Sequence, residues 1–152
     1  MENLIEVTLQ NLLQKISIDY SKIEIEKIDE ARYKININST DSSLLIGYNG
    51  ASLNALEHLL NILIKKISRK DDIYIKVDVD SYRHRQEERI KNLALRKAEI
   101  CKNTDQPQIL APMSSYYRRI IHLYISENFP NLITESIGEG ERRQIVIKLK
   151  DS

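Results

Sequence analysis

The tetrapeptide Gly47-Tyr48-Asn49-Gly50 places two glycines between two apolar runs that both have helical spacing. Glycine inside a helix costs about 1 kcal/mol relative to alanine, and the chain has only four glycines. The pair therefore predicts a turn between two helices, where the backbone comes close to another group because no Cβ atom intervenes. Free N–H groups in such a turn, next to the N-terminus of the following helix, suit a phosphate group.

Hydrophobic spacing predicts the other elements of the first part of the chain. Residues 4–16 repeat apolar side chains every three to four positions, as a helix does. Two runs, 21–28 and 31–38, alternate apolar and polar residues around Asp29-Glu30 and predict a hairpin. The segment 71–80 also alternates and predicts a strand with one apolar face, made of Ile73, Ile75, Val77 and Val79.

A longer helix is expected directly after the glycine pair. Ser52 stands where its hydroxyl can cap the N-terminus of this helix. The predicted apolar face consists of Leu53, Leu56, Leu60, Leu63 and Ile67. The first part of the chain thus reads helix, strand, strand, helix, turn, helix, strand.

The second part of the chain predicts a separate set of elements. A basic helix covers about 81–102, a turn-rich connection follows, and a second helix covers 114–129. Two alternating runs on either side of "GEGER" predict a closing hairpin. Since no linker rich in Gly, Ser or Pro separates the two parts, we expect the basic helix to join two domains, residues 1–80 and 81–152. The fold class is α+β.

Charge is unevenly distributed along the chain. Residues 1–80 contain ten Lys and Arg against thirteen Asp and Glu, a net charge of −3, and residues 81–152 contain thirteen against nine, a net charge of +4. Most of the arginines lie in the second part, and arginine binds phosphate in a bidentate manner. Solvated helix faces explain such a charge pattern equally well.

Composition excludes several classes of protein. No run of about 18 apolar residues is present to cross a membrane, and the N-terminal segment lacks the basic region of a secretory signal peptide. One cysteine, Cys101, excludes an internal disulfide, and with only three histidines a metal site is not expected. We therefore expect a cytoplasmic protein without a metal or cofactor.

The order of elements around the glycine pair resembles the bacterial type of KH domain, which begins with an additional helix. The resemblance covers residues 1–80 and implies the order α-β-β-α-α-β, with a loop that clamps about four nucleotides. It assigns nucleic-acid binding to Gly47, Tyr48, Asn49, Gly50 and Ser52, with Ile46 and Leu53 lining a groove for bases. The chain departs from related domains at Tyr48 and Asn49, where a basic residue is usual. A KH fold that contacts protein instead of RNA therefore stays an alternative.

A second motif lies in the C-terminal part. Arg118 and His122 are spaced i, i+4, so they share one face of the predicted helix. The runs "SYYRRIIH" and "SIGEGERRQIVI" resemble the single-stranded nucleic-acid-binding domain named for its Arg-x-x-x-His motif. This resemblance assigns binding to Arg118, Arg119 and His122, and to Arg142 and Arg143 where the predicted loop meets the last strand. From the residues alone, His122 could instead be a core histidine bonded to a backbone carbonyl.

A KH domain followed directly by an Arg-x-x-x-His domain is the arrangement of the bacterial Jag family, and the chain is identified as a member. The resemblance implies a protein that binds single-stranded RNA, with single-stranded DNA as the variant, and that regulates gene expression after transcription. It also implies a link to cell-envelope growth and partners in the envelope machinery. Because the sequence starts at the KH helix, the separate N-terminal domain of many Jag proteins is expected to be absent.

Two other function classes compete with RNA binding. A protein-interaction adaptor with a degenerate KH domain is the main alternative. An enzyme is not expected, because the sequence shows neither an acidic cluster for Mg²⁺ nor an activated nucleophile, although Glu139 and Glu141 lie near the Arg–His pair in sequence.

Overall fold

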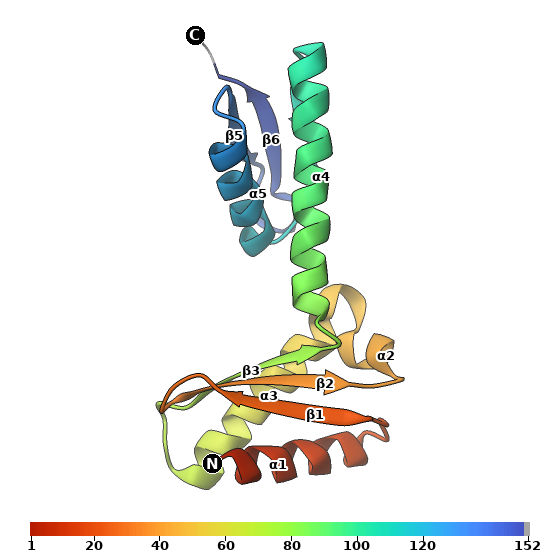
Figure 1. Cartoon of the computed structure of the whole chain (residues 1–152), viewed down its shortest axis with the longest axis vertical. Coiled ribbons are helices and arrows are strands. Elements are labelled where there is room, and N and C mark those ends of the chain that lie inside the picture. Colours follow the sequence, from red (N-terminus) through yellow and green to blue (C-terminus); the bar gives the residue numbers. More distant parts are fainter. Residues whose placement is uncertain (151–152) are drawn as a thin grey trace. The chain divides into compact units, whose positions relative to one another are not determined.

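A computed structural model describes residues 1–150 of the chain. The fold is α+β, as the sequence predicts, and the elements follow the predicted order except for one additional short strand in the second part (Figure 1). The chain divides into two compact units, one from Met1 to Arg83 and one that begins at His84.

The first unit is a three-stranded sheet with helices packed on it. The strand order is β1-β2-β3; β1 and β2 pair antiparallel, and β2 and β3 pair parallel. A parallel pair needs a long crossover, and the two helices with the glycine turn between them provide it. The elements are α1 (Glu2–Lys15), β1 (Lys22–Lys27), β2 (Arg32–Asn38), α2 (Ser42–Ile46), the 3-10 turn η1 (Tyr48–Gly50), α3 (Ala51–Ser68) and β3 (Tyr74–Val79).

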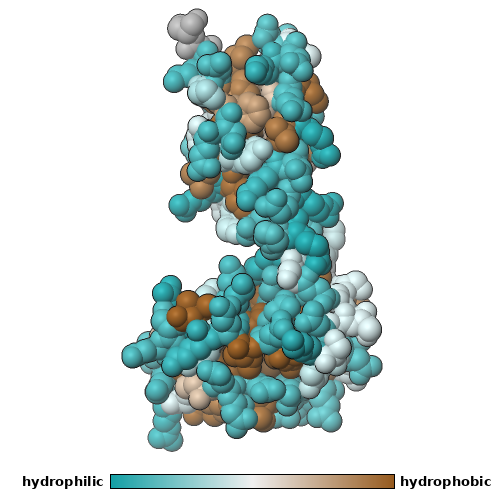
Figure 2. All heavy atoms as spheres, in the orientation of Figure 1, coloured by the Kyte–Doolittle hydropathy of each residue, from teal (hydrophilic) through white to brown (hydrophobic). Residues whose placement is uncertain are grey.

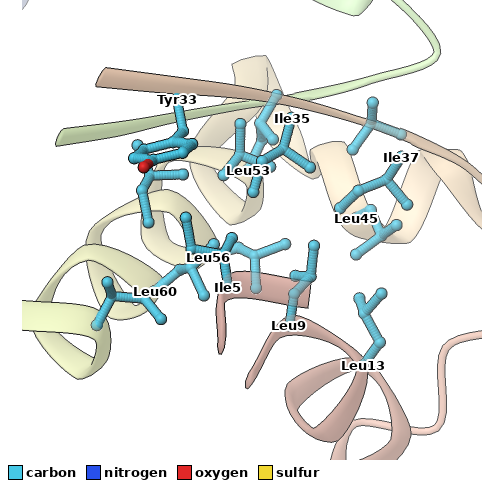
Figure 3. Packing of buried hydrophobic residues seen from close by; sticks show 14 of the residues in the cluster. Ile5, Leu9, Leu13, Tyr33, Ile35, Ile37, Leu45, Leu53, Leu56 and Leu60 are labelled. Atoms are coloured by element: carbon cyan, nitrogen blue, oxygen red, sulfur yellow. The ribbon is translucent and has the colours of Figure 1, made fainter. Parts of the chain in front are cut away.

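One face of this sheet forms the core with α1 and α3. Figure 3 shows side chains of β2 above those of the two helices, among them Ile35, Leu53 and Leu9. Each fully buried Leu or Ile contributes about 1.5–3 kcal/mol relative to an exposed one. The alternate residues of β1 and β2 are exposed or half-buried. The predicted inward face of the last strand is confirmed, since Ile73, Ile75, Val77 and Val79 are all buried.

The buried face of α3 differs from the predicted one at its C-terminal end. The buried positions are Leu53, Leu56, Leu60 and Ile64, whereas Ile67 is 54% exposed. The predicted spacing kept an average of 3.5 residues per turn, but a straight helix has 3.6 and rotates away from that repeat. Over four turns the rotation moves Ile64 into the core and Ile67 out of it.

The outer edge of β3 is closed by side chains. The Asn61 side chain accepts a hydrogen bond from the Ile75 N–H at 2.8 Å and donates to the Ile75 carbonyl at 2.7 Å. Glu57 accepts from the Val77 N–H at 2.9 Å, and Arg83 donates to the Val77 carbonyl at 3.2 Å and to Glu57 at 3.0 Å. These bonds satisfy strand groups that could otherwise pair with another strand.

We expect Asn61→Ala to destabilise the first unit by about 1–3 kcal/mol, because two strand groups lose their partner. The substitution should also remove the protection of the Ile75 amide against hydrogen exchange, which NMR measures in the full chain. His58→Ala, on an exposed face of the same helix, is the control and should leave that protection unchanged. Equal protection in the two variants would contradict the role of Asn61.

The second unit is a smaller three-stranded sheet with two helices. The strand order is β4-β6-β5, and both pairings are antiparallel. The short strand β4 lies in the segment that the sequence predicts as a turn-rich connection, and at two residues it is too short to show a periodicity. The elements are α4 (Tyr82–Thr104), β4 (Gln108–Ile109), α5 (Ser115–Asn128), β5 (Leu132–Ile137), the 3-10 turn η2 (Gly140–Arg142) and β6 (Gln144–Leu149).

The core of the second unit lies between the two helices and the strands β5 and β6. Ala94, Ala98 and Cys101 of α4 meet Ile121 and Ile125 of α5 in one buried cluster with the strands. Burial raises the pKa of the Cys101 thiol, and the charge of Asp105 adds to this effect.

Hydrophilic residues cover most of the surface visible in Figure 2, and hydrophobic residues show there in small groups. Among residues 1–150, every helix is too short or too polar to cross a lipid bilayer.

Candidate nucleic-acid interface

The conformation and packing of the turn itself require glycine at positions 47 and 50. Gly47 has φ 69° and ψ −172°, a region that is almost closed to other residues. A Cβ atom at Gly47 would lie 2.8 Å from the Cβ of Ser52. Gly50 has φ 80°, and a Cβ there would lie 3.3 Å from the Tyr82 ring. The glycines are therefore required by the turn itself, whether or not a ligand approaches it.

Ser52 does not cap the long helix as the sequence predicts. Helix α3 begins one residue earlier, at Ala51, with the left-handed Gly50 as its N-cap and without a side-chain cap hydrogen bond. The Ser52 side chain instead occupies the space that a Cβ atom on Gly47 would take. Among the described residues, no side chain caps the first N–H groups of α3 through its N-cap position.

Leu53 cannot line a groove for bases. It is 1% exposed and belongs to the core of the first unit, because its position on α3 faces the sheet. The apolar side chains that do reach solvent near the turn are Tyr48, which is 87% exposed, and Leu44, which is 66% exposed. The sequence did not indicate that Leu44 is exposed, because helical spacing alone does not show which face of the short α2 is outward.

The turn offers backbone groups and an aromatic ring but no charge. The four residues Gly47 to Gly50 include no Lys or Arg, and Asn49 holds a left-handed conformation with φ 49°. Stacking of a base on an aromatic ring contributes about 1–3 kcal/mol. The chemistry available here is thus a stacking contact beside uncapped helix N–H groups.

We expect Gly47→Ala to destabilise the chain by about 1–3 kcal/mol, from backbone strain and from the contact with Ser52. Gly140→Ala is the matched control: Gly140 also has a positive φ, of 54°, but a Cβ there meets no atom within 4 Å. Thermal unfolding of both variants measures the difference. If Gly140→Ala costs as much as Gly47→Ala, the close approach of Ser52 is not what demands the glycine.

The second unit brings several predicted residues together in one open pocket with a volume of about 290 Å³. Arg118, Arg119 and His122 approach it from α5, and Arg143 approaches it from the residue before β6. The remaining lining residues are Thr134, Ser136 and Ile145. Of the residues that the structure describes, no Asp or Glu lines this pocket, so its electrostatic character is positive.

Hydrogen bonds hold three of the four basic side chains in place. Arg118 Nη1 donates to the Met113 carbonyl at 2.6 Å, and Arg143 Nε donates to Ser136 Oγ at 3.0 Å. His122 Nδ1 lies 2.6 Å from Thr134 Oγ1. His122 is exposed and its partner is a hydroxyl, so the alternative of a core histidine on a backbone carbonyl is wrong.

The local fold explains why these side chains converge. Ser114 caps α5 by accepting a hydrogen bond from the Tyr117 N–H, which sets the start of the helix. Ile121 and Ile125 are buried, and they orient α5 so that Arg118 and His122 lie at the border of its core-facing side. The predicted pairing of these two residues on one helix face is confirmed.

Arg142 is separated from the other basic residues. It belongs to the 3-10 turn η2 and does not line the pocket, although it is exposed. Arg142 ends the predicted loop "GEGER", and the predicted strand after it starts at Arg143, whereas β6 begins at Gln144. The glycines at positions 138 and 140, both with positive φ, end the hairpin in a turn that includes Arg142.

The lining of the pocket consists of three arginines, one histidine, two hydroxyl side chains and one isoleucine. Within residues 1–150, the His, Cys, Asp and Glu side chains form no group of three or more that could hold a metal ion. The one cysteine is fully buried. Three arginines beside a histidine with an anchored ring are typical of a site that binds an anion.

Comparison with known families covers nearly all of the chain. Residues 2–79 match the family described as KhpA/KhpB, KH domain. Residues 88–149 match the family of the domain named for its Arg-x-x-x-His motif.

The chain belongs to the KhpB (Jag) family.

Three relatives carry the name RNA-binding protein KhpB. The KhpB of Clostridium symbiosum is 34% identical over 140 residues, which cover 92% of this chain and 60% of that protein. The KhpB of Bacillus subtilis is 35% identical, over 77% of this chain and 56% of that protein. The KhpB of Lactiplantibacillus plantarum is 30% identical, over 76% of this chain and 35% of that protein. The matched part thus spans 60% or less of the length of these KhpB proteins.

Proposed function

We propose that this chain binds single-stranded RNA, with the pocket of the second unit as its main contact to the phosphate backbone. The observation that carries the proposal is the convergence of Arg118, Arg119, His122 and Arg143 on one open pocket without a lining carboxylate among the described residues. Charge-assisted hydrogen bonds to phosphate are about twice as strong as neutral ones. The names of the three KhpB relatives support RNA as the ligand.

We propose that the glycine turn is the second contact and that the chain works as two domains, residues 1–80 and 81–152. The uncapped start of α3 accepts a phosphate, and Tyr48 stacks on a base. Gly47, Asn49, Gly50 and Ser52 shape this turn. Two modest sites on one chain raise each other's effective concentration for one RNA strand. Arg142 adds a long-range electrostatic contribution from outside the pocket.

We propose further that the protein acts in the bacterial cytoplasm as a regulator of gene expression after transcription, linked to growth of the cell envelope and to protein partners there. Membership of the Jag family supports this role. In this role the chain performs no catalytic step and uses no cofactor, and single-stranded DNA is the alternative ligand of the same pocket.

An adaptor that binds protein is the second candidate function. The exposed Leu44 and Tyr48, together with the lack of a basic residue in the turn, favour it for the first unit. In that case the second unit alone would bind RNA.

We expect the full chain to bind mixed-sequence single-stranded RNA with an affinity that falls steeply with salt. Each phosphate contact contributes about −0.7 to the slope of log K against log salt concentration for single strands, so three arginines predict a slope of about −2. Fluorescence anisotropy with labelled RNA measures it. If the folded protein fails to bind RNA at low salt, the adaptor function becomes the favoured one.

Arg118→Ala combined with His122→Ala should weaken RNA binding about tenfold or more, which corresponds to roughly 1.4 kcal/mol, and should flatten the salt slope by about one contact. Tyr48→Asp combined with Asn49→Asp should weaken it less, because the turn holds no cation to lose. Lys102→Ala removes one exposed charge of the same unit outside the pocket and is the control. The residue assignment is wrong if the pocket variant binds no worse than this control.

A further inference from the structure

Two hydroxyl side chains of β5 reach into the pocket from neighbouring inward positions. Thr134 and Ser136 are two residues apart on the strand, so they point to the same face. Their cross-strand partners on β6 are Ile147 and Ile145, both buried. The hydroxyls thus stand at the border between the core and the pocket, where each meets one basic side chain.

The hydroxyl of Thr134 affects which ring nitrogen of His122 carries a proton. The ring nitrogen Nδ1 contacts the Thr134 hydroxyl, and a hydroxyl can either donate or accept. When the imidazole is neutral, the hydroxyl can donate to Nδ1, so that the proton stays on Nε2. When the imidazole is protonated, the same hydroxyl can accept from the Nδ1 N–H. With the hydroxyl as donor to the neutral ring and as acceptor from the protonated ring, Nε2 carries a proton in both states.

A carbonyl or a carboxylate in place of Thr134 would behave differently. Such a group only accepts, so it would hold the proton of a neutral imidazole on Nδ1 and leave Nε2 as an acceptor. An acceptor repels the oxygens of a phosphate group. A hydroxyl partner therefore lets His122 offer an N–H to an anion whether or not the ring is charged.

Ser136 has the corresponding effect on Arg143. It accepts from Nε at 3.0 Å, which leaves both terminal nitrogens of the guanidinium for other acceptors. A guanidinium with its stem held in this way loses less side-chain entropy when it binds phosphate.

We propose that Thr134 and Ser136 are positioning residues of the RNA pocket, Thr134 by keeping the proton of His122 on Nε2 and Ser136 by fixing the guanidinium of Arg143. This inference rests on the proposed function for its ligand and adds the two residues that prepare the pocket for a phosphate group.

The test uses the full chain with Thr134→Val, Thr134→Ser and Ser136→Ala. Valine has nearly the volume of threonine without its hydroxyl, and serine restores the hydroxyl. Long-range proton–nitrogen NMR at alkaline pH, where histidine is neutral, reports which ring nitrogen of His122 carries the proton. Anisotropy with single-stranded RNA reports the affinity, and circular dichroism confirms the fold.

The wild type and Thr134→Ser should show the proton on Nε2, and Thr134→Val should show a mixture of both forms. Thr134→Val and Ser136→Ala should each weaken RNA binding about threefold to tenfold, the range for loss of one hydrogen bond, while Thr134→Ser should stay within about twofold of the wild type.

Several results would overturn the assignment. A proton on Nδ1 in the wild type would remove the role of Thr134, and so would a Thr134→Val variant that binds RNA as the wild type does. Unchanged binding by Ser136→Ala would remove the role of Ser136. A wild-type chain that binds no RNA would overturn the proposed function instead, while the proton position would still decide whether Thr134 sets the ring.

Discussion

The candidate pocket depends on the burial of Ile121 and Ile125 against the strands of the second unit. These two residues, spaced i, i+4, fix the rotation of α5 about its axis. Arg118 and His122 lie one turn apart at the border of that buried stripe. Their side chains therefore project along the strands and line the pocket. A rotation of α5 by one residue, about 100°, would bury a cation or move it away from β5. Packing of the core thus determines where the positive charge of the pocket lies.

The two units offer different chemistry for one kind of ligand. The turn of the first unit presents backbone N–H groups and the exposed ring of Tyr48, which suit a base and one phosphate. The pocket of the second unit presents fixed cations, which suit the phosphate chain. This division agrees with the net charges of the two parts of the chain, negative up to residue 80 and positive after it.

Patterns with a repeating period made most of the fold predictable. Alternation in 71–80 and helical spacing in 4–16 reflect burial on one side of an element, and the structure has these elements where the sequence predicts them. The failures lie at element ends. The start of α3 at Ala51 instead of at a Ser52 cap follows from the left-handed Gly50, and backbone conformations of this kind leave no periodic signal.

The sequence predicts those features of the candidate site that lie within one helix or strand, but not the contacts between elements. The spacing of Arg118 and His122 showed that they share a helix face, but the partner strand could not be derived from one helix. Thr134 and Ser136 therefore could not be assigned, although their spacing of two residues on a predicted strand is visible in the sequence. Arg142 and Arg143 are adjacent, so only the end of the hairpin decides that Arg143 lines the pocket while Arg142 does not.

The most direct measurement is an NMR titration of the labelled full chain with a short single-stranded RNA. We expect the side-chain signals of Arg118, His122 and Arg143 to shift first and furthest, together with the backbone amides from Gly47 to Ala51. Signals of the opposite face of the second sheet, such as those of Glu135 and Lys148, which pair with each other at 2.7 Å, should stay in place. Shifts concentrated at Glu135 and Lys148, with the pocket unchanged, would contradict the assignment of the pocket as the RNA contact.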